Sequence, residues 1–131
     1  MLTSDDIKMT TVLVCMTCRA ASDPLGSIPR GPDLAAATLE AAGDSSDVRV
    51  LKVRCLANCN RGLSAALRRD GAWTYVFGHL DPDRDGPALI EGARLLSSST
   101  DGLLPWRERP EALKRGLIAR VPPLTFEGEP T

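Results

Sequence analysis

The chain has 131 residues, of which 25% are charged, and a formal net charge of −1. That length suffices for one domain with a single modest core, and the near-neutral charge creates no overall field that would attract nucleic acid or an anionic lipid surface. No apolar stretch approaches the roughly 20 residues that span a bilayer, and the acidic N-terminus is unlike a secretory signal, so we expect a soluble, cytoplasmic protein with no membrane contact, whose thiols stay reduced.

The first half of the chain predicts a strand, a helix and a second strand. Thr10 to Cys15 is an apolar, β-branched run that is typical of a buried strand. A loop rich in glycine, proline and serine follows over residues 19–32, and Asp33 to Ala42 carries apolar side chains at helical spacing. Residues 47–53 then alternate between apolar and charged side chains, which predicts the second strand.

A pair of cysteines stands at the end of each of these strands. Cys15 and Cys18 follow the first strand, Cys55 and Cys59 follow the second, and the chain contains no other cysteine. Because a crossover helix places successive strands parallel and adjacent, both pairs should leave the sheet at the same edge. Two tight pairs of thiols at one edge are typical of a four-thiolate metal site, so we predict that all four cysteines bind one metal centre.

The second half of the chain predicts an antiparallel hairpin and another helix. Leu63 to Arg69 and Ala72 to Phe77 have the pattern of strands, and the Asp70-Gly71 pair between them is a strong hairpin signal. A helix with an apolar stripe begins at Asp81 or Asp85. The resulting order β-α-β-β-β-α predicts an α/β domain with a mixed sheet of four to five strands and a C-terminal tail.

Aromatic residues and the single histidine lie in this hairpin. Trp73, Tyr75 and Phe77 fall on one face of the second hairpin strand, which favours a core role over a platform for stacking nucleic-acid bases. His79 follows that strand, and because four cysteines already fill a metal site we expect it to be exposed or to make a local hydrogen bond.

The domain boundaries follow from these elements. We expect an N-terminal tail over residues 1–9, one domain over 10–100, and a proline-rich, basic tail over 101–131 that packs on the domain and contains one short helix around Glu111 to Ala119. Residues 105–120 carry five cations and two glutamates. This excess of positive charge is consistent with docking of an acidic flavoprotein or enzyme, and equally with a solvated amphipathic segment.

The order of elements, with one cysteine loop after the first strand and Cys-x3-Cys after the second, resembles the thioredoxin-like [2Fe-2S] ferredoxins and the small iron-sulfur subunit of respiratory NADH dehydrogenases. The match covers about residues 10 to 98, and the first pair departs from it, because those relatives place more residues between their first two ligands. The whole chain, including Cys15-Met16-Thr17-Cys18-Arg19, is also similar to an uncharacterised family of small bacterial proteins described as predicted metal-binding and often encoded beside cobalamin-biosynthesis genes.

The resemblance implies a thioredoxin-like ferredoxin fold and a [2Fe-2S] cluster held by Cys15, Cys18, Cys55 and Cys59. It implies a one-electron carrier, not an enzyme, that serves a reductive step in cobalamin (corrinoid) metabolism. The partners would be electron-donor and electron-acceptor proteins, such as a flavoprotein or a corrinoid-pathway enzyme. Many relatives of this fold dimerise, so a homodimer is expected as well.

Two other uses of the same thiols stay open. Zinc also takes four thiolates in tetrahedral geometry, which would make the protein a zinc-binding or metal-handling accessory protein. A metal-free dithiol or disulfide couple is the other alternative, because Cys15-x-x-Cys18 alone has the spacing of a thioredoxin-type redox motif. A long loop and not a helix follows that motif, however, and the motif leaves Cys55 and Cys59 without a role.

Overall fold

The computed structural model describes residues 8–19, 23–24 and 26–130. Their elements form one five-stranded mixed sheet, three α-helices and a short 3-10 turn at Cys59–Arg61. The strands are β1 (Thr10–Cys15), β2 (Val48–Val53), β3 (Ala65–Arg68), β4 (Thr74–Phe77) and β5 (Leu117–Val121). The helices are α1 (Gly31–Ala42), α2 (Gly86–Ser97) and α3 (Glu111–Arg115).

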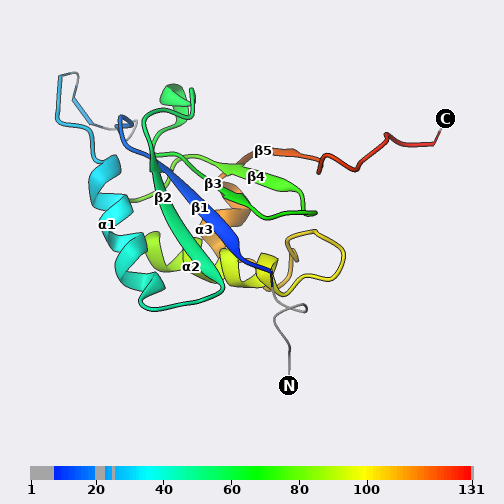
Figure 1. The fold of residues 1–131 in the computed structure, drawn as a ribbon. Helices are drawn as coiled ribbons and strands as arrows, with labels where there is room; N and C mark the ends of the chain where they lie inside the picture. The colour runs from blue at the N-terminus through cyan, green and yellow to red at the C-terminus, as the bar shows by residue number, and fades with distance from the viewer. Residues whose placement is uncertain (1–7, 20–22, 25, 131) are drawn as a thin grey trace.

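The sheet has the order β2-β1-β3-β4-β5. β1 pairs parallel with β2, and every other neighbouring pair is antiparallel. The parallel register sets Thr10 opposite Val48 and Cys15 opposite Val53, so both strands end at the same edge of the sheet. This confirms the predicted strand-helix-strand arrangement, and Figure 1 shows the chain leaving the two strands side by side at the upper end of the sheet.

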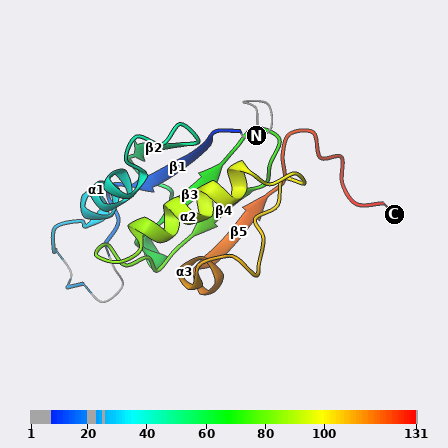
Figure 2. The same ribbon diagram turned by 90° about the horizontal axis from the view of Figure 1, so that it is seen from below.

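One face of the sheet is covered by α1 and α2, which pack against each other (Figure 2). Alternate side chains of β1, among them Val12 and Val14, are fully buried and share a core cluster with Leu34 of α1 and Leu89 of α2. Burial of this apolar surface is the main source of stability, at about 25 cal/mol per Å² removed from water. Within the described residues, no helix is long and apolar enough to cross a membrane.

The segment after α2 differs from the predicted helix around Glu111 to Ala119. The helix α3 ends at Arg115, and Leu117–Val121 forms β5, which adds a fifth strand to the sheet by pairing with β4. A Cβ at Gly116 would lie 2.7 Å from the carbonyl oxygen of Gly78, and the N–H of Gly78 donates to the carbonyl of Gly116 at 2.8 Å. The helix therefore stops where its backbone meets the end of β4, because the open edge of β4 offers unpaired hydrogen-bonding groups.

Candidate metal centre

The first cysteine pair lies at the buried end of β1. Cys15 is the last residue of the strand, and both Cys15 and Cys18 are buried, with Cys18 1% exposed. The thiol of Cys18 donates a hydrogen bond to the sulfur of Cys15, and the two Sγ atoms are 3.1 Å apart. Both cysteines are free thiols. Two sulfurs on one tight loop could both reach a single metal ion.

The two thiols of this pair differ in acidity. Burial raises the pKa of Cys15, but hydrogen bonds from Cys18 and from the backbone N–H groups of Leu56 and Thr17 outweigh burial and bring that pKa below its ordinary value. Burial, the hydrogen bond to Cys15 and the charge of Cys15 together raise the pKa of Cys18 to about 11. Cys15 is therefore the first thiolate of the pair to form, and Cys18 stays protonated as its donor.

The second cysteine loop follows β2 and is open to solvent. Cys55 is an exposed free thiol, and the N–H of Ala57 donates to its sulfur at 3.1 Å. Ala57 makes this bond in a left-handed conformation, with φ of 57°, which an alanine side chain disfavours. Cys59 begins the 3-10 turn, and its side chain lies outside the described part of the structure.

The two loops touch through hydrogen bonds to the backbone carbonyls at the end of β2. The hydroxyl of Thr17 donates to the carbonyl of Arg54 at 2.8 Å, and the N–H of Met16 donates to the carbonyl of Val53 at 2.8 Å. The Cys15 sulfur lies 3.9 Å from the same Arg54 carbonyl, directly before Cys55. The side chains that are described do not include a group of three or more His, Cys, Asp or Glu close enough to hold a metal ion. The structure thus brings Cys15 and Cys18 together and sets Cys55 on the adjoining loop.

Two glycines pack on the first cysteine loop. A Cβ at Gly31, the first residue of α1, would overlap the carbonyl oxygen of Cys15 and lie 2.8 Å from the Cα of Met16. A Cβ at Gly62 would overlap the carbonyl of Arg19 and lie 3.3 Å from the Cβ of Cys18. The loop is therefore held from both sides by backbone that has no room for a side chain. The Gly-Pro pair that begins α1 was the only sequence signal of this close approach, and the same pair is also typical of a loop.

The end of β4 supports the second loop in a similar way. A Cβ at Gly78 would lie 2.5 Å from the carbonyl of Arg61 and 3.1 Å from the side-chain nitrogen of Asn58. The next residue, His79, donates its N–H to that Arg61 carbonyl at 2.7 Å, while its side chain is exposed. The histidine thus reaches the second loop through its backbone, in agreement with the expected local hydrogen bond.

The cations of the C-terminal segment lie against aromatic rings. Arg109 is 8% exposed, and its guanidinium carbon sits 5.5 Å from the ring centre of Tyr75 and 5.0 Å from that of Trp106. Lys114 also lies over Trp106, and Arg120 lies 4.3 Å above the ring of Trp73. Tyr75 and Phe77 are buried with their rings stacked, so the core role expected for these aromatic residues is confirmed.

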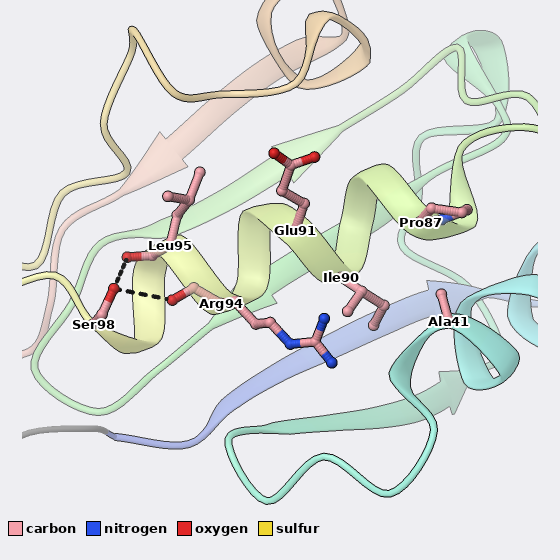
Figure 3. A pocket seen from close by; sticks show the side chains of 7 residues that line it. All are labelled: Ala41, Pro87, Ile90, Glu91, Arg94, Leu95 and Ser98. Carbon is pink, nitrogen blue, oxygen red and sulfur yellow. Dashed lines mark hydrogen bonds between the residues drawn. The ribbon is translucent and has the colours of Figure 1, made fainter. Parts of the chain in front are cut away.

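A hollow of about 350 Å³ lies between α1 and α2 (Figure 3). Its lining contains no cysteine and comprises Ala41, Pro87, Ile90, Glu91, Arg94, Leu95 and Ser98. The Arg94 guanidinium, which borders the hollow, hydrogen-bonds the Ser45 hydroxyl and lies 3.9 Å from a carboxylate oxygen of Asp47. These contacts tie α2 to the turn before β2, so this hollow is part of the scaffold and the candidate site stays at the cysteine edge.

Comparison with known proteins gives a family and two structures of similar fold, each matching most of the chain. A family model described as "Protein of unknown function (DUF1636)" matches residues 12–123. Two structures of a thioredoxin-like [2Fe-2S] ferredoxin from Aquifex aeolicus superpose with TM-scores of 0.57 and 0.55, at 20% and 18% identity. The first covers 91% of this chain and 99% of the ferredoxin, and the second 86% and 98%. No curated protein sequence gives a significant match. The fold predicted from the sequence, a thioredoxin-like ferredoxin fold, is confirmed by these superpositions.

Proposed function

Starting from the DUF1636 family, to which this chain belongs, we propose that the protein is an electron carrier that holds a [2Fe-2S] cluster on Cys15, Cys18, Cys55 and Cys59. The observation that carries the proposal is the pair of buried sulfurs 3.1 Å apart, on a loop that touches the loop of Cys55. A [2Fe-2S] centre requires four thiolates, two for each iron, from separate short loops. The fold is that of proteins whose structures are described as [2Fe-2S] ferredoxins.

The residues of this chain fit the negative charge of a [2Fe-2S] cluster bound by thiolates. The N–H groups of Leu56 and Ala57 donate to the sulfurs of Cys15 and Cys55, which stabilises negative charge on those thiolates. Burial of the first pair keeps water away from one side, and Cys55 borders solvent on the other. When bound, such a cluster supplies one-electron transfer between ferric and ferrous states; the chain contributes the ligands, the N–H donors and the partial exclusion of water.

An anaerobic visible absorption spectrum of freshly purified protein tests the proposal, with iron, sulfide and zinc quantified on the same sample. We expect bands that bleach with dithionite, at about two irons and two sulfides per chain. A colourless protein with about one zinc, which anaerobic iron and sulfide fail to convert, would reject the electron carrier and leave the zinc-binding or metal-handling function.

The finer assignments follow from the sequence. We propose that the carrier, which is not itself an enzyme, delivers electrons to a reductive step in corrinoid metabolism, such as lowering the oxidation state of cobalt. A reconstituted assay with the reduced protein and a corrinoid reductase tests this, and absence of electron transfer to any such enzyme would remove it. The cytoplasmic location, the donor and acceptor proteins and the homodimer likewise stay predictions.

A further inference from the structure

We propose that the surface around the second cysteine loop is the docking face for a redox partner protein whose contacting face is acidic. This inference rests on the proposed electron-carrier function and adds the place and the chemistry of the encounter. The surface is defined by four exposed cations, Arg19, Lys52, Arg54 and Arg61, which we call the cationic rim.

The rim has a charge opposite to that of the whole molecule. The two cysteine segments, residues 15–19 and 52–62, contain these four positive side chains and no aspartate or glutamate. The complete chain has a formal net charge of −1. Positive charge is thus gathered on the two segments that carry the thiols, and such local fields steer the approach of an oppositely charged protein.

The rim residues take no part in the ion pairs found among the described residues. Three ion pairs occur in the described part of the chain: Arg30 pairs with Asp33 and with Asp83, and Arg94 pairs with Asp47. Lys52, Arg54 and Arg61 take part in none of them, and Arg19 hydrogen-bonds the carbonyl of Ser27 through its Nε. A partner carboxylate would therefore meet cations that need not first break an internal pair.

The cations of the basic C-terminal segment that lie on aromatic rings are less suited to this task. Arg109 is enclosed between Tyr75 and Trp106, and Arg120 lies on Trp73. These cations already interact with aromatic rings of the same chain, and moving them toward a partner would break those contacts. We therefore place the docking face at the rim and not on the basic segment.

A recess beside the rim has a polar lining that includes one of the rim cations. It has a volume of about 340 Å³ and is lined by Ala57, Asn58, Asn60 and Arg61. The guanidinium of Arg61 supplies several N–H donors, which match the two oxygens of a carboxylate. The amide of Asn60 adds another donor at this exposed edge. Exposed Cys55 belongs to the same loop, so a partner seated here lies beside the proposed cluster ligands.

Nuclear magnetic resonance mapping on the isotope-labelled full chain tests the proposal, with an acidic flavodoxin as the probe. We expect the shift changes of this chain, recorded by direct carbon-13 detection, to concentrate in residues 16–19 and 52–61. Binding should weaken as salt is added, because exposed charges are screened beyond about 8 Å at physiological ionic strength. Reversing two rim charges in Arg54→Glu/Arg61→Glu should raise the dissociation constant by about tenfold or more.

The control is Arg115→Glu, which reverses one exposed cation of the basic segment and should change the dissociation constant by less than about twofold. A dispersed amide spectrum verifies that each variant folds, and Arg54→Gln/Arg61→Gln replaces the double reversal if that variant does not. Shift changes confined to residues 105–121, no binding at all, or equal weakening by Arg115→Glu would overturn the proposal.

Iron and sulfide analysis of the same samples separates this inference from the proposed function. If the protein holds a cluster but the probe ignores the rim, the docking face is wrong and the electron carrier stands. If the probe binds at the rim but no cluster forms even after reconstitution, the rim is a docking face for an acidic protein, and the claim that this protein is a redox partner is rejected.

Discussion

The two cysteine loops leave neighbouring strands at one edge of the sheet, yet they are built differently. The first pair is buried, and its loop is clamped between the backbones of Gly31 and Gly62. The second loop exposes Cys55 and turns through a left-handed alanine, Ala57. One half of the candidate site therefore belongs to the core, where packing decides its geometry, and the other half belongs to the surface, where a partner can reach it.

The clamp on the first loop should give the largest effect when it is broken. In Gly31→Ala the new methyl group would overlap the Cys15 carbonyl, so α1 or the loop must shift, and we expect the free energy of unfolding to fall by about 1–3 kcal/mol. Urea denaturation of the full chain measures this. Ala36→Ser, on the exposed side of the same helix, is the control and should change stability by less than about 0.5 kcal/mol. Equal stability of both variants would show that the loop is not clamped.

Exchange of cysteine for serine compares the two loops directly. In the metal-free protein, Cys18→Ser places a hydroxyl in a buried site and should lower the free energy of unfolding by about 1–2 kcal/mol. Cys55→Ser, at an exposed position, should change it by less than about 0.5 kcal/mol. Both variants should lose bound iron. If Cys55→Ser destabilised the metal-free fold as much as Cys18→Ser, the division into buried and exposed halves would be wrong.

The acidities of the first pair predict a two-step titration in the metal-free protein. The lowered pKa of Cys15 means that its thiolate forms below the ordinary value of 9.0, while Cys18 retains its proton up to about 11. Between 9.0 and about 11 the folded protein thus holds a proton on Cys18 that the unfolded chain releases, so this thiol makes stability fall as pH rises through that window.

Ultraviolet thiolate absorbance measures this titration, with Cys55→Ser/Cys59→Ser used to remove the second pair. Cys18→Ala removes the donor to Cys15 and should raise the pKa of the remaining thiol. A pKa for Cys15 that does not respond to this change would show that the hydrogen bond between the two sulfurs does not set its acidity.

The smallest expected effect concerns the strained turn of the second loop. Ala57→Gly allows the left-handed conformation at lower cost and should raise the free energy of unfolding. We expect a gain of only about 0.5 kcal/mol, because glycine loses more chain entropy on folding and this offsets part of the effect. Ala57→Val should lower it by about 1 kcal/mol, because a β-branched side chain disfavours this conformation more strongly. Thermal unfolding at several denaturant concentrations distinguishes the two. Identical stabilities would mean that the turn carries no strain.

Several features of the site were accessible from local pattern and others were not. The strands that deliver the cysteines follow from alternation and from β-branched runs, and the crossover helix between them requires a common edge. The clamp at Gly31 was not accessible, because nothing local shows that the start of α1 meets the end of β1. The same holds for Arg69, which is buried and donates to the carbonyls of Leu96 and Ser99 at the end of α2, while its neighbour Arg68 is exposed.

By itself the sequence determined the order of the elements through β4 and α2, the two cysteine pairs and the edge at which both loops emerge, because hydrophobic periodicity and strand connection are local properties of the chain. Only the tertiary structure decided that Leu117–Val121 is a strand and not the end of a helix, because its partner is the open edge of β4, about forty residues earlier. It alone also decided which cations are enclosed by aromatic rings and which form the cationic rim, since burial depends on neighbours that are distant in sequence.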